Sequence, residues 1–408
     1  MNNDAQQAIR DFLTGAREEQ VRFLAELVKV PSDNPPGDCA RHAERAAELL
    51  EGMGFTVERH RVPDAAVRAV GMVSATNLVV RKRFGEGPVV ALNAHGDVVP
   101  PGEGWTRDPY GAEVVEGWMV GRGAAVSKSD FATYAYALRA LETAGLGRGT
   151  VELHLTYDEE SGGEIGPKWL LEQGISQPDF AIAAGFSYAV VAAHNGCLHL
   201  EVEVNGKSAH AALPATGVDA LEAATAVLNA LYARRAGFAG TVSAVPGIGS
   251  PQLTVGLIRG GINTNVVPDR VTLRLDRRMI PEEEPAAVER DLRAVIAGAV
   301  AAFPAARVEV RRILLAEPLK PLPGTDRLAD VLCRHASRVM GEPVETKGVP
   351  LYTDARHYAA AGVPIALYGA GPRTIEEANA HRADERLPLS DLHKATEVVA
   401  LALFELLS

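Results

Sequence analysis

The decisive stretch of this sequence is PVVALNAHGD, residues 88–97, in which a continuous apolar run ends in a histidine and an aspartate two residues apart. Such a run predicts a strand over about Pro88–Asn93 that is covered on both faces, as in a parallel sheet. Ligands of open α/β sheets bind beyond the carboxyl ends of strands, so His95 and Asp97 are expected at a site. A metal-ligating histidine usually gives its other N–H to a carboxylate, which Asp97 can supply. The alternative is a surface turn, because short His-x-Asp matches are common.

A second apolar strand, Thr150–Tyr157, ends in neighbouring carboxylates and a Gly-Gly turn. The carboxylates of Asp158, Glu159 and Glu160 repel one another unless a cation or a catalytic role compensates. One carboxylate can bind a metal while its neighbour accepts a proton from the attacking water. The alternative is a solvated acidic turn.

The pattern around these strands alternates helix and strand, which indicates an α/β fold with a mostly parallel sheet. From about residue 195 the pattern changes to strands that alternate apolar and polar side chains, typical of a sheet with one face covered by helices. The α/β pattern resumes near Pro318 and continues to the end of the chain. We therefore predict one α/β domain, residues 1–194 and 316–408, interrupted by an inserted α+β domain, residues 195–315. The elements expected are helices over 11–28, 39–53, 129–144, 218–234, 283–301 and 392–407, and strands over 76–81, 88–93, 150–157, 197–204, 252–258, 270–276 and 365–368.

Composition limits the function classes. The 408 residues suffice for two or three domains. The 41 basic and 52 acidic residues give a net charge of −11 that is not concentrated at either end, which argues against nucleic acid and anionic membranes as partners. The first 20 residues lack an apolar stretch of signal-peptide length, so a cytoplasmic location is expected. The odd set of Cys39, Cys197 and Cys333 is expected to consist of reduced thiols.

Two further segments carry loop histidines: His210 in Gly206–Ala211 and His381 in Asn379–Glu385. Together with the two strand ends they resemble, in order and spacing, the zinc-dependent aminoacylase family that includes acetylornithine deacetylase, succinyl-diaminopimelate desuccinylase and bacterial glutamate carboxypeptidase. The resemblance covers nearly the whole chain and implies a catalytic domain with an inserted lid domain that also forms a homodimer. Further matching motifs are residues 32–37, 121–124, 260–261 with 265–268, and 353–356.

The resemblance also implies roles for individual residues. His95, Glu160 and His381 correspond to zinc ligands, with Asp97 behind His95 and Glu159 as the general base. The remaining implied roles concern the substrate: His210 stabilises the oxyanion across the dimer interface, Asn265 and Arg278 hold the backbone and carboxylate, and Gly369 lines the pocket. A guanidinium fork suits a carboxylate well.

The sequence departs from the family at two ligand positions. Val126 stands where the family has an aspartate that bridges two metals, and Phe186 stands where it has another carboxylate. His95, Glu160 and His381 remain, a set that suits one zinc ion per chain better than two, with manganese or cobalt as alternatives. Candidates to replace a lost ligand are Asp130, Asp158 and His194, although Asp130 also suits a helix N-cap.

Three hypotheses follow. The first is a metallohydrolase that cleaves the C–N amide-type bond of a small carboxylate-bearing compound: an N-acyl or N-carbamoyl amino acid or a dipeptide-like molecule. The second is a metal-free acid–base enzyme that works through Glu159, Glu160 and the histidines. The third is a non-catalytic metabolite-binding relative, which the joint retention of Glu159 and His210 disfavours.

Overall fold

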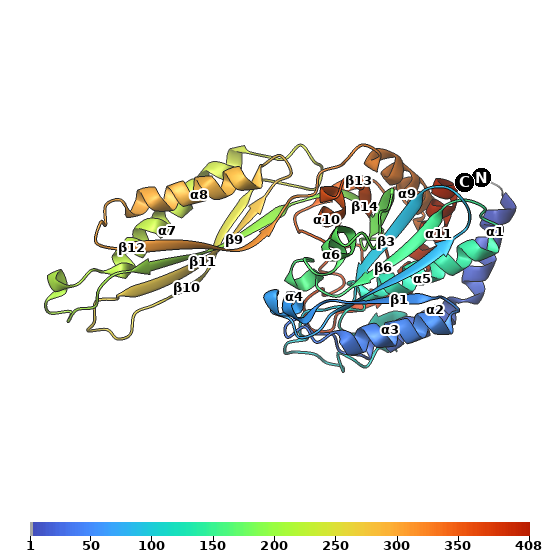
Figure 1. Ribbon diagram of the computed structural model, residues 1–408, viewed down its shortest axis with the longest axis horizontal. Coiled ribbons are helices and arrows are strands. Elements are labelled where there is room, and N and C mark those ends of the chain that lie inside the picture. Colours follow the sequence, from blue (N-terminus) through green and yellow to red (C-terminus); the bar gives the residue numbers. More distant parts are fainter. Residues whose placement is uncertain (1–2) are drawn as a thin grey trace. The chain divides into compact units, whose positions relative to one another are not determined.

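The computed structural model describes residues 3–408 and divides the chain into two compact units (Figure 1). Unit 1 comprises the described residues up to Ala192 together with Pro321–Lys347 and Thr353–Ser408. Unit 2 comprises Ala193–Lys320 and Gly348–Tyr352. Each unit has its own apolar core. None of the helices over residues 3–408 is both long and apolar enough to cross a bilayer.

Unit 1 is built on an eight-stranded sheet of order β1-β2-β6-β3-β7-β14-β8-β13. Its central strands β6, β3, β7 and β14 are parallel, as expected, whereas β1, β2 and β8 add antiparallel pairs toward the edges. Parallel neighbours share one carboxyl edge, where a site is expected. The strands are β1 Val57–Arg61, β2 Thr76–Arg83, β3 Val89–His95, β6 Thr150–Thr156, β7 Phe180–Ala183, β8 Val190–His194, β13 Thr346–Val349 and β14 Ile365–Leu367.

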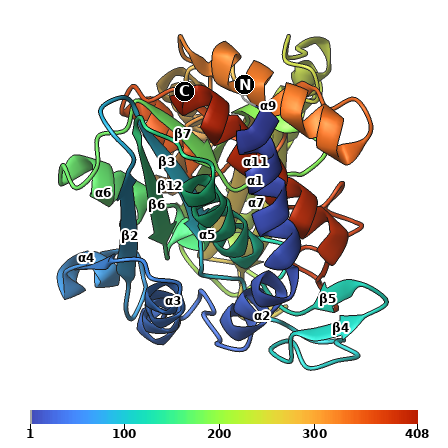
Figure 2. The same ribbon diagram turned by 90° about the vertical axis from the view of Figure 1, so that its right-hand side faces the viewer.

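Helices cover this sheet (Figure 2). Helix α5 (Lys128–Thr143) packs against β3 and β6 and is contacted in turn by α1, α2 and α11. It is buried on nearly all sides, which its Ala- and Tyr-rich sequence permits. The other helices of unit 1 are α1 Asn3–Gly15, α2 Arg17–Val28, α3 Ala40–Gly52, α4 Asp64–Ala69, α6 Pro167–Glu172, α9 Thr325–Met340, α10 Ala355–Ala360 and α11 Leu389–Leu407. A small sheet of β4 Glu113–Val115, β5 Trp118–Val120 and β15 Arg386–Pro388 completes unit 1.

The prediction of a single helix over residues 11–28 is wrong in one respect. The chain breaks at Ala16 between α1 and α2. The apolar periodicity continues across the break because both helices pack on α5.

Unit 2 is an antiparallel four-stranded sheet of order β10-β11-β9-β12. Two helices pack on it, and Leu198, Leu200 and their alternate neighbours along β9 form a core with them. The elements are β9 Gly196–Asn205, α7 Ala220–Ala236, β10 Gln252–Gly260, β11 Arg270–Met279, α8 Pro285–Val300 and β12 Arg307–Ala316. Helix α7 begins at Asp219, whose carboxylate caps it by accepting hydrogen bonds from two backbone N–H groups.

Candidate active site

The acidic turn after β6 is anchored by Asp97, the residue that follows β3. The parallel register pairs His95 with Thr156, so the segments that leave the two strands run side by side. Asp97 is fully buried, and its carboxylate accepts hydrogen bonds from the backbone N–H groups of Glu159 (3.3 Å) and Glu160 (3.1 Å). Asp97 therefore positions both glutamates as well as the histidine.

The ring of His95 is oriented by the same residue. Its Nδ1 lies 2.9 Å from the backbone carbonyl of Asp97 and 3.4 Å from Oδ1. Both neighbours are acceptors, so Nδ1 carries the proton, and Nε2 faces Glu159 Oε2 at 4.0 Å. Burial opposes a charge on His95, but the Asp97 bond and the charge of Glu159 outweigh burial and raise its pKa well above the ordinary value. The predicted pairing of His95 with Asp97 is thus present in the structure, shared between the carbonyl and the carboxylate.

Glu159 sits in an environment that suits a base. Burial raises its pKa, the nearby His95 lowers it, and Glu160 and Asp97 raise it, to about 7. A carboxylate tuned to this range accepts a proton near neutral pH and returns it readily.

His381 reaches the cluster from a distant part of the chain. Its Nε2 lies 3.3 Å from Glu160 Oε1, and the hydrogen bond to Glu160 raises the pKa of His381. The loop that carries it is held by a buried ion pair between Arg122 and Glu385 (2.6 Å). Arg122 also donates to the carbonyl of Arg382 (3.2 Å). This ion pair therefore fixes the His381 loop against the segment after β5.

The donor set fits one divalent cation. Ligand atoms of His95, Glu159 and Glu160 lie within 4.8 Å of one another, and His381 joins them through Glu160. Zinc bonds of about 2.0–2.2 Å place neighbouring ligand atoms about 3.4 Å apart, close to the 3.3 Å between His381 Nε2 and Glu160 Oε1. The family resemblance places Val126 where a second cation would need a bridging aspartate, and a hydrocarbon side chain offers no ligand atom.

The three proposed replacement ligands are engaged elsewhere. The expectation that Asp130 caps α5 is wrong, because the N-cap residue is Ser127. The Asp130 carboxylate instead reaches the loop after β14, where its Oδ1 accepts a hydrogen bond from the N–H of Ala370 (2.7 Å). A Cβ on Gly369 would lie 2.1 Å from this oxygen, so the contact requires glycine. Burial raises the pKa of Asp130 to about 7.

The other two candidates also have partners. Asp158 Oδ2 accepts a hydrogen bond from the N–H of Ile165 (2.6 Å), and His194 Nδ1 lies 2.9 Å from the backbone oxygen of Asn195.

The other predicted substrate residues lie in unit 2, at two places. His210 and Asn265 are on paired loops, since Ala211 N–H donates to the carbonyl of Asn265 (3.0 Å). His210 is exposed, and its Nδ1 accepts the N–H of Ala212 (3.1 Å). Arg278 is on β11, where Nε donates to Asp276 Oδ1 (2.9 Å).

Two residues near the site, Asn34 and Asp354, were not predicted individually from the sequence. Asn34 donates to Asp97 Oδ2 (3.0 Å) and to Ser161 Oγ (3.1 Å), which ties the acidic turn to the loop after α2. Asp354 is 4% exposed, and neither of its carboxylate oxygens has a hydrogen-bond partner among the described residues. Burial and then the charge of Glu159 raise the pKa of Asp354 to about 8. Both residues lie in motifs that carry the family resemblance, which was the only signal for them.

A family model and sequence relatives place this site in context. The model of peptidase family M20/M25/M40 matches residues 91–405. The chain belongs to this family. It is 29% identical to a succinyl-diaminopimelate desuccinylase of Gluconacetobacter diazotrophicus, over 97% of this chain and 99% of that protein. It is 30% identical to an acetylornithine deacetylase of Myxococcus xanthus, over 88% and 90%.

Solved structures of M20 enzymes share the fold. An M20 metallo-carboxypeptidase from Sulfolobus solfataricus superposes with a TM-score of 0.77 at 17% identity, covering 95% of this chain and 100% of that one. Human carnosine dipeptidase 1 superposes with a TM-score of 0.74 at 17% identity, covering 98% of both chains. The predicted combination of an α/β domain with an inserted α+β domain is therefore the fold of the M20 family.

Proposed function

We propose that this M20 protein is a metallohydrolase that cleaves the C–N amide-type bond of a small carboxylate-bearing compound with one cation bound at this site. The observation that carries the proposal is the convergence of His95, Glu159, Glu160 and His381 beside buried Asp97. When a divalent cation is bound, it lowers the pKa of water and polarises a carbonyl group, as amide hydrolysis requires. His95, Glu160 and His381 would hold it, with zinc as the first choice of ion.

Glu159 is the proposed general base. Its burial and raised pKa leave it able to take a proton from water and to pass it to the leaving nitrogen. Asp97 holds the Glu159 backbone in place, so the base is fixed before substrate arrives.

The proposed substrates are N-acyl or N-carbamoyl amino acids and dipeptide-like compounds. Arg278 is the proposed partner of the substrate carboxylate, because a guanidinium fork suits such a group; in the structure its Nε and Nη2 donate to Asp276. His210 and Asn265 are proposed to bind the oxyanion and the substrate backbone. Gly369 supplies backbone surface beside Asp130.

The first experiment measures metal content by inductively coupled plasma mass spectrometry on protein purified without added metal. Relative to the wild type, the Glu160→Ala, His381→Ala double variant should hold about one zinc fewer per chain. Turnover of a panel of N-succinyl, N-acetyl and N-carbamoyl amino acids and dipeptides then tests the base. Glu159→Gln should lower kcat by about 10² to 10⁴-fold and leave KM within a small factor.

Two results would favour the other hypotheses. Turnover that survives exhaustive chelation, with no metal bound, would support metal-free acid–base chemistry by Glu159 and His95. Binding of these compounds without turnover above a Glu159→Ala control would support a metabolite-binding protein.

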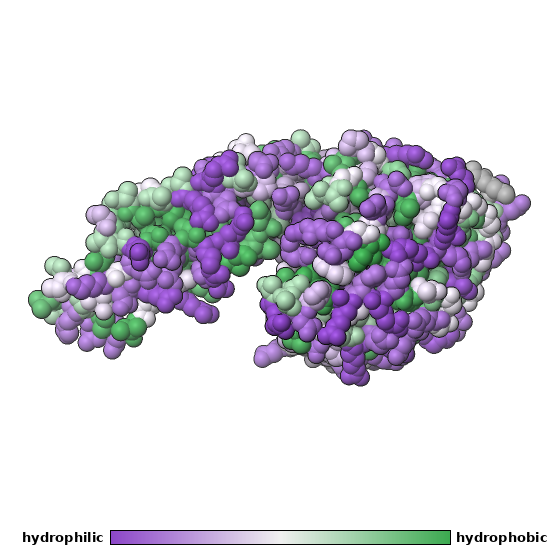
Figure 3. All heavy atoms as spheres, viewed as in Figure 1, coloured by the Kyte–Doolittle hydropathy of each residue, from purple (hydrophilic) through white to green (hydrophobic). Residues whose placement is uncertain are grey.

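Unit 2 is proposed to serve as lid and as homodimer interface. Seven of the large apolar side chains exposed in the described residues lie in this unit: Leu213, Leu221, Tyr232, Val242, Ile258, Ile262 and Ile313. Figure 3 shows apolar patches on its surface, on the left of the view. Its edge strand β10 carries part of this apolar surface and leaves one side of its backbone unpaired within the described chain.

A further inference from the structure

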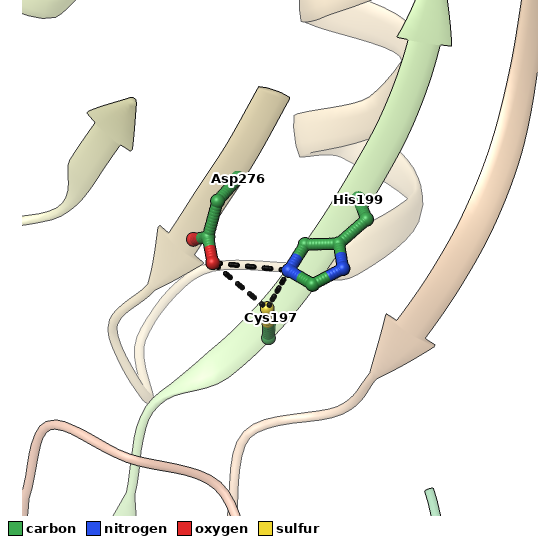
Figure 4. Close-up of side chains that lie close together, drawn as sticks. All are labelled: Cys197, His199 and Asp276. Carbon is green, nitrogen blue, oxygen red and sulfur yellow. Dashed lines mark hydrogen bonds and ion pairs between the residues drawn. The ribbon is translucent and has the colours of Figure 1, made fainter. Parts of the chain in front are cut away.

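A second group of metal-ligand side chains lies in unit 2: Cys197 and His199 on β9, and Asp276 on β11 (Figure 4). Residues 197 and 199 alternate with Leu198 and Leu200, which face α7 and α8, so the group lies on the opposite face of the sheet. The antiparallel register pairs His199 with Asp276 and Cys197 with Arg278. The strand geometry therefore gathers four polar side chains at one place.

The three candidate ligand atoms have the spacing of a metal site. Cys197 Sγ lies 3.2 Å from His199 Nε2 and 3.8 Å from Asp276 Oδ2. His199 Nε2 lies 3.0 Å from Asp276 Oδ2. In a tetrahedral zinc site with bonds of about 2.3 Å to sulfur and 2.0–2.2 Å to nitrogen and oxygen, these separations are about 3.4–3.6 Å. Each observed distance is within a few tenths of an ångström of that range.

We propose that Cys197 Sγ, His199 Nε2 and Asp276 Oδ2 bind Zn²⁺ at a site separate from the His95 cluster, with a fourth position open to water. On binding, Cys197 gives up its proton to solvent, and the cation replaces the hydrogen bonds that now join the three atoms. A thiolate ligand favours zinc over magnesium and calcium. Thiolate and carboxylate together supply two negative charges for the divalent ion.

Asp276 is oriented for this role before any ion arrives. Arg278 Nε donates to Oδ1 at 2.9 Å, which leaves Oδ2 directed at His199 and Cys197. Arg278 also reaches Oδ2, from Nη2 at 3.1 Å and Nε at 3.2 Å, so a bound cation and Arg278 share this oxygen. The guanidinium stacks over the ring of Tyr352, 5.8 Å from its centroid, which steadies it. Support of a ligand by such neighbours typically strengthens metal affinity.

The test is a titration of chelator-treated protein with Co²⁺, in the wild type and in the Glu160→Ala, His381→Ala variant. Thiolate ligation gives a sulfur-to-cobalt charge-transfer absorption in the near ultraviolet, which histidine and carboxylate ligands cannot produce. We expect this band in both proteins, its displacement by Zn²⁺, and its loss in Cys197→Ser. Cys333→Ser, which removes a half-buried cysteine of α9, is the matched control and should keep the band.

A second variant controls for the possibility that Cys197→Ser loses the band by misfolding. His199→Gln leaves the thiol in place, and the half-buried position accommodates glutamine. It should weaken Co²⁺ binding by about tenfold or more while circular dichroism stays unchanged. Absence of the band in folded wild type, its persistence in Cys197→Ser, or unchanged affinity in His199→Gln would overturn the proposal and leave a hydrogen-bonded cluster that only orients Arg278. None of these results depends on whether the protein hydrolyses amides.

Discussion

Asp354 is the residue whose environment makes the sharpest prediction. Its ordinary pKa of 3.8 is raised to about 8 in the folded protein, by burial first and then by the charge of Glu159. Between about pH 4 and pH 8 the folded state keeps this proton while the unfolded state has lost it. The contribution of Asp354 to the free energy of unfolding is therefore fully present below its ordinary pKa of 3.8. It is lost as the pH rises to the folded-state pKa of about 8, by up to about 1.4 kcal/mol per pH unit.

Asp354→Asn removes this dependence. In chelator-treated protein, the melting temperature of the variant relative to wild type should rise steadily from pH 5 to about pH 8 and then level off. Differential scanning calorimetry at several pH values measures the difference. Asp326→Asn, at an exposed position of α9, is the control and should show no such trend. A difference for Asp354→Asn that is independent of pH would contradict the argument.

The predicted apolar strands end just before His95, Asp97, Glu159 and Glu160, so these residues could be predicted from the sequence. Asp354 could not, because it is buried near Gly163 and Glu159, about 190 residues away in the chain. The proximity of His381 to Glu160 was likewise implied only by the family resemblance.

At the scale of elements, the loop that carries His381 depends on the ion pair between Arg122 and Glu385. Both side chains are almost fully buried, at 1% and 2% exposure. Removing one partner of a buried pair leaves an uncompensated charge and costs about 3–5 kcal/mol. Arg122→Ala should therefore lower the free energy of unfolding by that order in urea denaturation, and Arg122→Met with Glu385→Gln should recover part of the loss.

The same variants test how the element serves the site. Because Arg122 also bonds the carbonyl of Arg382, Arg122→Ala should weaken zinc binding at the His95 cluster as measured by competition with a chelating dye. Arg61→Ala breaks an exposed pair with Asp64 (3.0 Å) and is the matched control. It should change neither stability nor zinc affinity measurably. Equal losses in the two variants would argue against a special role for the buried pair.

The sequence pattern predicts seven of the 15 strands in the described residues and most of the long helices, but it misses eight strands, helix α9 and the break between α1 and α2. The break at Ala16 is invisible because both α1 and α2 direct their apolar faces at α5. Strand β12 was not predicted, because it is an edge strand with a register shift between Arg312 and Leu314. This shift interrupts the simple alternation of side chains.

At the scale of the whole molecule, the sequence predicts an inserted domain over residues 195–315. The compact units divide at 192/193 and 320/321, and Gly348–Tyr352 also belongs to unit 2. Sequence composition carries this information because the two sheets differ in kind: β3 is buried on both faces, whereas β9 alternates buried and half-buried residues. Assembly is not encoded so directly, since it depends on which apolar side chains remain exposed after folding.

The proposed homodimer makes the final prediction. Ile258 at 53% exposure and Ile262 at 78% lie on and beside edge strand β10, and apolar groups this exposed favour association. Sedimentation equilibrium should show a dimer for the wild type and a monomer for Ile258→Lys with Ile262→Lys, because charge on an edge strand opposes pairing with a second copy. Val73→Lys with Val114→Lys, at exposed positions of unit 1, is the matched control and should remain dimeric. A wild type that is monomeric at micromolar concentration, or a dimer lost only in the control, would place the apolar surface of unit 2 in some other role, such as closing over substrate.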